Sequence, residues 1–216
     1  MAINNDMLQN KTYSINIITN VYLDDKMNAA FQSRPMTLFK QNNKLHVFEG
    51  SEIEIINDAK LQAVINHKSK TIILSDLSIV NPDSVSEFKT NYLKFIDADL
   101  DSINNLHKEI KFEKLSKKSV KYELIGNGLN PVKIAWVMID VENKMYSSIR
   151  SLFAKKELVP ELDNKEHYLA VERLFKGYNK NPVFNSETFN LNKFIRQNSN
   201  GSFTLTEKYK KYELIN

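Results

Sequence analysis

The sequence has no cysteine among its 216 residues, which excludes disulfides, thiol catalysis, iron–sulfur clusters and cysteine-ligated zinc. Glycine and proline are scarce, at 5 residues each. No apolar stretch approaches the roughly 20 residues that a membrane-spanning helix needs. The mean hydropathy of -0.43 also excludes a membrane-embedded protein. Hydrophobic residues make up 42% of the chain, which is enough for a core. A length of 216 residues predicts a single domain, residues 1–216.

Positive charge is in slight excess, with 30 Lys and Arg against 26 Asp and Glu. Short basic clusters, such as Lys117 and Lys118, are typical of solvated surface or of edge-strand protection. We therefore predict no nucleic-acid partner. A weak attraction to anionic lipid headgroups is the functional alternative.

Apolar and polar residues alternate through the first third of the chain, which is the period of a strand with one buried face. The clearest segment carries Tyr13, Ile15 and Ile17 on one side. Short polar turns separate the segments, and short connections favour antiparallel neighbours. Such a meander predicts a mainly β fold with a large curved antiparallel sheet. The further strands are predicted at residues 36–41, 44–49, 52–56, 61–66, 71–74, 109–113, 119–125, 132–142, 145–154 and 170–178.

A helix, or two short ones, is predicted over about residues 83–106, where Asp83 or Ser84 can cap the first turn. We expect its apolar stripe to cover one face of the sheet. Residues 155–167 are charged and are predicted to form a loop. Residues 202–214 are predicted to end the chain as an extended tail or strand.

The sequence shows no Gly-x-Ser-x-Gly elbow, Walker loop or dinucleotide fingerprint. Strand carboxylates such as Glu52 and Glu54 are expected to point to solvent. No histidine is followed by a second ligand at metal-binding spacing, so we interpret the four histidines as structural. They are His46, His67, His107 and His167. We predict no enzyme activity, no cofactor and no metal site.

Alternating carboxylates at Asp97, Asp99 and Asp101 are superficially similar to a calcium loop. The glycine and the terminal glutamate that such a loop needs are missing. We interpret these residues as a negatively charged helix end or turn.

The one tryptophan lies on a predicted strand that is apolar on both faces, which is typical of a central strand. Trp136 and Met138 share a face with Ile134, and we expect neighbouring strands to add further apolar side chains. The ordinary interpretation is that these side chains form part of the hydrophobic core. The functional interpretation is that they line an apolar cavity in which an acyl chain lies. The candidate lining residues are Ile15, Ile17, Ile134, Trp136, Met138, Ile149, Phe153 and Phe175.

Several short sequence segments occur in an order that is similar to that of a known protein family. In the first half they lie at residues 13–17, 36–40, 43–47, 54–58 and 70–74, and in the second half at 132–142 and 146–153. In this layout the chain resembles the bacterial outer-membrane lipoprotein carrier and receptor (LolA/LolB-like) family. The resemblance implies an incomplete, strongly curved antiparallel barrel lidded by helices, with an apolar interior for acyl chains. It assigns no individual functional residue.

The first six residues contain neither a basic n-region nor an apolar h-region. The chain is therefore either cytosolic or a mature form whose export signal has been removed, and we favour the second. Our leading hypothesis is a non-enzymatic carrier of lipid or lipoprotein acyl chains, in the periplasm or on a periplasm-facing outer-membrane anchor. One alternative is a structural or adaptor module of an envelope or secretion assembly with an envelope protein partner. Another is a hydrolase or isomerase that uses Asp and His in the cavity.

Overall fold

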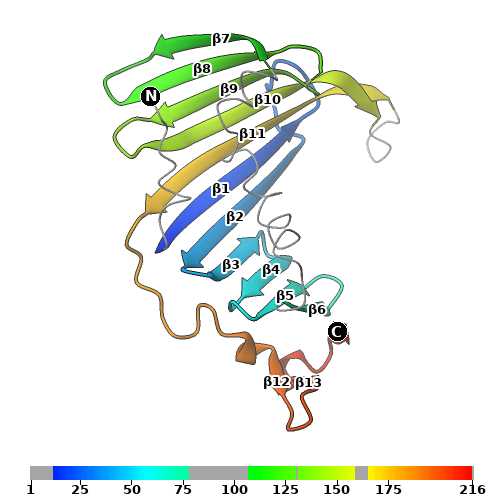
Figure 1. Cartoon of the computed structure of the whole chain (residues 1–216). Helices are drawn as coiled ribbons and strands as arrows, with labels where there is room; N and C mark the ends of the chain where they lie inside the picture. Colours follow the sequence, from blue (N-terminus) through cyan, green and yellow to red (C-terminus); the bar gives the residue numbers. More distant parts are fainter. Residues whose placement is uncertain (1–11, 78–106, 130, 159–164, 216) are drawn as a thin grey trace. The chain divides into compact units, whose positions relative to one another are not determined.

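The computed structural model describes residues 12–77, 107–129, 131–158 and 165–215, and these residues are mainly β (Figure 1). The first group of strands is β1 (Thr12–Tyr22), β2 (Gln32–Gln41), β3 (Lys44–Glu49), β4 (Ile53–Asn57), β5 (Leu61–Asn66) and β6 (Thr71–Asp76). The second group is β7 (His107–Lys114), β8 (Ser119–Gly126), β9 (Val132–Asp140), β10 (Met145–Leu158) and β11 (Glu166–Asn179). The C-terminal segment adds β12 (Ile195–Gln197), β13 (Phe203–Leu205), β14 (Glu213–Ile215) and two 3-10 helices, η1 (Leu191–Lys193) and η2 (Glu207–Tyr209).

Twelve strands form one sheet in the order β14-β6-β5-β4-β3-β2-β1-β11-β10-β9-β8-β7, and β12 pairs with β13 separately. Neighbours from β2 to β6 and from β7 to β11 pair antiparallel. The last strand, β14, pairs parallel with β6. The predicted fold class, mainly β with an open antiparallel sheet, is confirmed. The helix predicted over residues 83–106 and the carboxylates at 97, 99 and 101 lie outside the described residues.

The chain divides into two compact units. The first unit contains the described parts of Ile17–Pro35 and Leu93–Lys176, and the second contains those of Asn10–Asn16, Met36–Tyr92 and Gly177–Asn216. Strands β7 to β10 belong to the first unit, and β3 to β6 with the C-terminal segment belong to the second. No helix in the described ranges has the length and apolar character needed to cross a lipid bilayer.

In the first unit, side chains that face each other across β8 to β11 lie in rows on one face, because paired residues point to the same side of a sheet. One row contains Ile125, Ile134, Leu152 and Ala170. Leu152 and Ala170 are buried there with Tyr22, and Trp136 packs against them. The other face buries Ala135, Ile139 and Ile149. Burial on both faces confirms β9 as a central strand.

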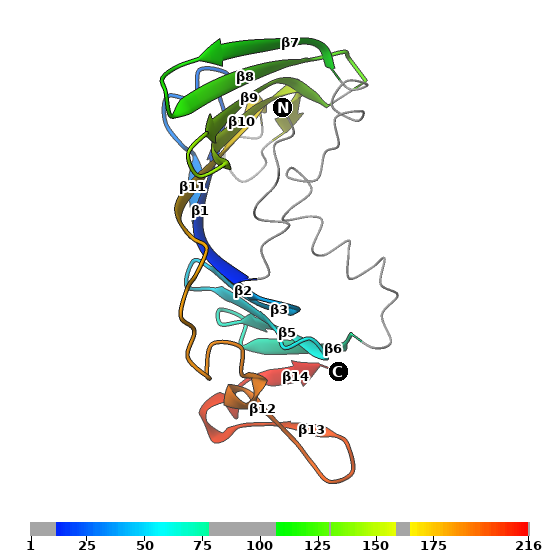
Figure 2. The same ribbon diagram turned by 60° about the vertical axis from the view of Figure 1, so that its left-hand side comes forward.

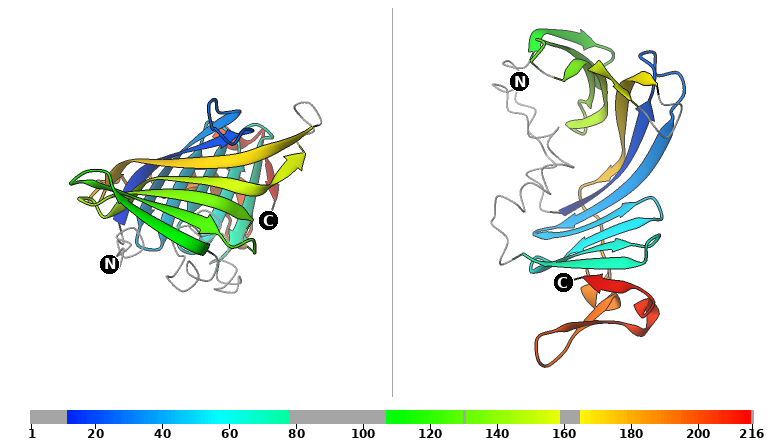
Figure 3. Two further views of the ribbon diagram at one scale, coloured as in Figure 1. Left: turned by 90° about the horizontal axis from the view of Figure 1, so that it is seen from above. Right: turned by 90° about the vertical axis from the view of Figure 1, so that its right-hand side faces the viewer.

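In the second unit, the apolar face of β4 to β6 is covered by the C-terminal segment. Ile56, Ile65 and Ile72 are fully buried against Phe194 and Tyr209. Figure 2 shows β14 beside β6 and β12 close by, and Figure 3 shows β3 to β6 side by side. The buried residues of 189–195, namely Phe189, Leu191, Phe194 and Ile195, sit on η1 and its flanks.

Two strands are longer than the sequence pattern predicts. Residues 155–167 were expected as a loop, but β10 continues to Leu158 and β11 begins at Glu166. That prediction is wrong for residues 155–158 and 166–167, because backbone pairing continues through this charged segment. Lys156 faces Tyr168 in this pairing and places its ammonium 5.0 Å from the ring centroid.

Gly126 ends β8 where the backbone passes close to the start of β9. A Cβ at this position would lie 2.3 Å from the carbonyl oxygen of Val132. No side chain fits such an approach to backbone, so the sequence needs glycine here for space.

Candidate functional site

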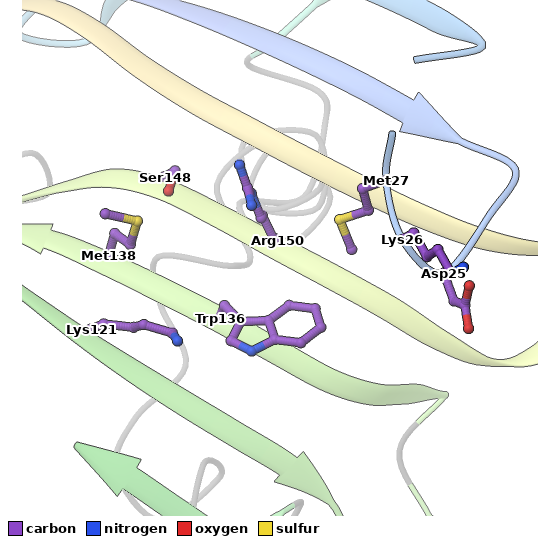
Figure 4. Close-up of a pocket in the computed structure, with 8 residues that line it drawn as sticks. All are labelled: Asp25, Lys26, Met27, Lys121, Trp136, Met138, Ser148 and Arg150. Atoms are coloured by element: carbon purple, nitrogen blue, oxygen red, sulfur yellow. The ribbon is translucent and has the colours of Figure 1, made fainter. Parts of the chain in front are cut away.

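The candidate site is a cavity of about 310 Å³ in the first unit (Figure 4). It lies between one face of β8, β9 and β10 and the connection that follows β1. Three apolar side chains line it: Met27, Trp136 and Met138. The polar lining consists of Asp25, Lys26, Lys121, Ser148 and Arg150. The lining is therefore mixed and more polar than the apolar cavity that the sequence predicted.

The register of the sheet builds the centre of this site. Five residues of five neighbouring strands lie in one row on the same face, with Trp136 in the middle and alternating charges on both sides. In order from β7 to β11 they are Lys111, Glu123, Trp136, Arg150 and Glu172. The next row places Lys121, Met138 and Ser148 side by side. The lining residues on β8, β9 and β10 are thus fixed by strand pairing, and Asp25, Lys26 and Met27 come from the connection after β1.

Arg150 is held by a buried carboxylate. Its Nε donates to Oε1 of Glu172 at 2.5 Å. The other carboxylate oxygen, Oε2, accepts hydrogen bonds from Tyr22 Oη at 2.8 Å and from Asn20 Nδ2 at 3.1 Å. Glu172 is only 3% exposed, while the side chain of Arg150 is 52% exposed. One edge of the guanidinium is therefore anchored and the rest faces the cavity mouth.

The pKa directions agree with this geometry. Burial of Glu172 alone would raise the pKa of its carboxyl, but the hydrogen bonds from Asn20, Tyr22 and Arg150 outweigh it and leave the pKa below its usual value. The pKa of the Tyr22 phenol is raised, first by burial and then by its bond to Glu172. Glu172 is accordingly a carboxylate near neutral pH, and it balances the charge of Arg150.

Trp136 presents its ring rather than its N–H to the cavity. The indole Nε1 donates to Oε2 of Glu123 at 2.9 Å, and Lys111 approaches the other oxygen of Glu123 at 3.2 Å. Met27, which adopts a φ of 54°, packs with Trp136 against the core of the first unit. The polar atom of the indole is satisfied, so the exposed part of the ring offers apolar contact.

Some of the lining residues predicted from the sequence come together here. Trp136 and Met138 line the cavity. Ile134 lies on the same face of β9, opposite Leu152. Ile149 is paired with Val137 and therefore points to the other face.

The remaining predicted lining residues lie elsewhere. Leu174 of β11 pairs with the lining residue Ser148, so Phe175, the next residue, points to the other face. There the centroid of its ring lies 6.2 Å from that of Tyr146. Phe153 lies beyond a register shift in β10. Ile17 is buried in β1, and Ile15 belongs to the second unit. A role for any of them in ligand binding stays a prediction.

A second polar cluster lies in the second unit, around Glu54. Oε1 of Glu54 is 2.7 Å from Nε2 of His46, and Oε2 is 3.3 Å from Nε2 of His67. The other ring nitrogens reach the C-terminal segment: Nδ1 of His46 contacts the carbonyl oxygen of Thr188, and Nδ1 of His67 lies 3.0 Å from Tyr212 Oη. The cluster therefore connects β3, β4 and the turn after β5 to the segment that covers them.

Glu54 is 8% exposed, so the prediction that this carboxylate points to solvent is wrong. The reason is pairing: β4 places Glu54 on the covered face, where both histidines reach it. Burial opposes ionisation, but the hydrogen bonds and charges of His46 and His67 outweigh it and lower the pKa of Glu54. Every ring nitrogen of the cluster has a partner, which supports a structural interpretation.

The cavity is lined by apolar side chains together with three cations, Lys26, Lys121 and Arg150. Its described lining contains no histidine beside Ser148 that could act as a general base. Among the described residues, no group of three or more His, Asp or Glu side chains could hold a metal ion. The sequence pattern did not reveal the cations Lys26, Lys121 and Arg150, or Glu172, which anchors Arg150. A charged residue within an apolar strand such as 170–175 was an available signal.

No protein-family model matches the chain, and its sequence has no significant match among curated proteins. Similar solved structures include a DUF1329 family protein from Desulfovibrio piger, with 8% identity, a TM-score of 0.30, and coverage of 88% of this chain and 95% of that one. Another is a domain from Vibrio parahaemolyticus whose name assigns it to outer membrane lipoprotein sorting. It has 9% identity, a TM-score of 0.31, and coverage of 84% and 90%. At these TM-scores the likeness carries no argument about fold or ligand, and the resemblance to the lipoprotein carrier and receptor family stays a prediction.

Proposed function

We propose that the protein is a non-enzymatic binding or carrier protein that holds part of an acyl chain, from a lipid or lipoprotein, in the cavity of the first unit. The observation that carries the proposal is the apolar surface of Met27, Trp136 and Met138 around one cavity. A flat aromatic ring and two flexible thioether side chains adapt well to a chain of methylenes.

The volume limits what can bind. Ligand pockets usually measure about 300–1,000 Å³, and this cavity, at about 310 Å³, is at the lower end. It accommodates a single chain or the first part of one, and not several chains together. The proposal is therefore a site for one chain.

The expected affinity is modest. Each buried methylene contributes about 0.8 kcal/mol, so about ten of them contribute about 8 kcal/mol. Association itself costs at least about 4 kcal/mol. The net, at most about 4 kcal/mol, corresponds to a dissociation constant in about the millimolar range for the chain alone. A carrier benefits from this range, because it must also release its ligand.

Native mass spectrometry of the protein mixed with millimolar single-chain lipid tests the proposal. We expect an adduct with the mass of one lipid that is lost in Met138→Asp, which places a carboxylate in the apolar lining. Val183→Asp is the matched control, because Val183 is 99% exposed and lies in the other unit. No adduct, together with no calorimetric binding of a neutral acyl chain, would reject the proposal.

Absence of catalysis belongs to the same proposal. Incubation with acyl esters followed by product analysis is expected to return the ester unchanged. Release of the free acid, abolished by Ser148→Ala, would instead favour the hydrolase alternative.

We place the protein in the cell envelope, in the periplasm or on a periplasm-facing outer-membrane anchor. The acyl-chain site and the resemblance found in the sequence support this placement. Fractionation of cells that express the natural gene tests it, with recovery in the periplasmic or outer-membrane fraction as the expected result.

A second candidate function is an adaptor that recruits an envelope protein by strand addition. The observation in its favour is β7, which stands at one end of the strand order and carries exposed Ile110 and Phe112. Pull-down with envelope extracts, compared between the natural chain and Ile110→Lys, tests it. Loss of a specific partner in the variant would favour the adaptor.

A further inference from the structure

We infer that the ligand of this cavity carries an anionic oxygen group, a carboxylate or a phosphate, next to its acyl chain, and that Arg150 binds this group. The inference rests on the proposed function and specifies the class of ligand: a single-chain anionic amphiphile. The juxtaposition that carries it is an anchored guanidinium beside the apolar lining.

The guanidinium is oriented before any ligand arrives. Nε is engaged by Glu172, so the end of the fork formed by the two terminal amino groups points away from the carboxylate. Among the described residues, none accepts a hydrogen bond from these amino groups. Two parallel N–H donors in a plane match the two oxygens of a carboxylate or phosphate. Because the side chain is already fixed, binding loses little of its rotamer freedom.

Glu172 does not compete with the ligand. Both of its oxygens accept hydrogen bonds within the protein, one from Arg150 and the other from Tyr22 and Asn20. Burial keeps this carboxylate behind the guanidinium, away from the solvent-exposed end. The anchor therefore positions Arg150 and leaves its outer edge to an incoming anion.

The charge around the cavity is complementary to an anion. Besides Arg150, the lining contains Lys26 and Lys121, and its one described carboxylate is Asp25, an exposed residue. Lys121 is only partly neutralised, since Glu113 lies 3.6 Å from its Nζ. Glu172 and Glu123 in the same row offset the wider positive field, so the attraction for a negative group is local to the exposed guanidinium and ammonium groups.

The geometry also places the chain. Figure 4 shows Trp136 beside Arg150, with Met27 and Met138 on either side of that pair. A head group bound to Arg150 would therefore leave its first methylenes next to Trp136, Met27 and Met138. A free inorganic anion would use the guanidinium but leave the apolar lining wet, and a neutral chain would do the reverse. Only an amphiphile uses both.

Isothermal titration calorimetry of the full chain with dodecanoate, dodecyl phosphate, dodecanol and dodecyltrimethylammonium tests the inference. Acetate and inorganic phosphate serve as chain-free anions. We expect both anionic amphiphiles to bind at least about tenfold more tightly than dodecanol. A difference in affinity of this size corresponds to about one charge-assisted hydrogen bond. The cationic amphiphile is expected to bind more weakly than dodecanol.

Arg150→Lys keeps the charge but removes the planar fork, and is expected to reduce the preference for dodecanoate over dodecanol to about threefold or less. Arg196→Lys, the same change at an exposed position in the other unit, is the matched control and should leave the preference unchanged. Because Arg150 is half-exposed, high salt should also reduce the preference in the unmodified protein. This salt test needs no variant.

The outcomes separate the two proposals. Equal binding of dodecanoate and dodecanol, or a preference that salt does not change, would overturn the inference of an anionic head group. The proposed acyl-chain site would then remain. Failure of every amphiphile to bind would reject the proposed function itself. Binding of acetate or phosphate as tight as that of dodecanoate would show a site for free anions and would overturn the inference that the ligand is an amphiphile.

Discussion

Glu54→Gln removes the charge at the centre of the histidine cluster while keeping the shape of the side chain. The carboxylate is 8% exposed, and its shorter contact, 2.7 Å to His46, is to a buried partner. The contact to His67 is 3.3 Å and that side chain is 29% exposed, so it contributes less. Removal of one partner of a buried pair costs about 3–5 kcal/mol, and we take the lower part of this range because the amide retains one acceptor. The expected loss in the free energy of unfolding is about 3 kcal/mol, measured by urea denaturation at neutral pH.

Glu52→Gln is the matched control, two residues away. Its side chain is 62% exposed and lies 3.9 Å from Lys68. A surface ion pair of this kind contributes about 0–1 kcal/mol. Equal effects of the two substitutions would refute the buried cluster.

The buried carboxylate of Glu54 also predicts that stability depends on pH. The pKa of Glu54 is lower in the folded than in the unfolded chain. Its contribution to stability is therefore complete above the unfolded pKa, about 4.3, and is lost as the pH falls through the folded value. The difference in stability between the unmodified chain and Glu54→Gln should shrink on acidification below that range. A difference that stays constant into strong acid would contradict the assignment.

Other substitutions test the core, the turn and the anchor. Leu191→Ala, at a residue 4% exposed, should reduce stability by about 2–5 kcal/mol, whereas Leu129→Ala, at a residue 84% exposed, should change it by less than about 0.5 kcal/mol. Gly126→Ala should cost about 1–3 kcal/mol, measured by thermal unfolding, because the added Cβ would meet a backbone oxygen at 2.3 Å. Tyr22→Phe removes a hydrogen bond to the buried Glu172 carboxylate and should cost about 1.5 kcal/mol in urea unfolding; no loss would mean that Asn20 alone anchors this oxygen.

Local pattern predicted most of the strands. Polar dipeptides at the turns gave the bounds of β3 and β5 as the structure has them, because a turn residue ends a strand regardless of what surrounds it. The extensions of β10 and β11 could not be predicted in this way. Their charged side chains are typical of loops, and only the partner strand supplies the hydrogen bonds that make them β.

The site was less predictable than the fold. Trp136 and Met138 were found because their hydrophobicity and spacing are visible in one strand. Arg150 and Glu172 lie 22 positions apart in sequence and acquire meaning only through the register of β10 and β11. Glu54 was missed for the same reason: its histidine partners lie on the neighbouring strand β3 and in the turn after β5, and composition alone favours an exposed carboxylate.

The most direct test of the account uses the single tryptophan, Trp136, which lines the cavity and therefore reports on that site alone. An acyl chain that carries bromine atoms on its first methylenes quenches a tryptophan only when the two touch. Titration with brominated dodecanoate is predicted to quench most of the Trp136 emission in a saturable way, with unbrominated dodecanoate as a competitor. Calorimetric binding of the same molecule without quenching would place the chain elsewhere on the protein and contradict the account.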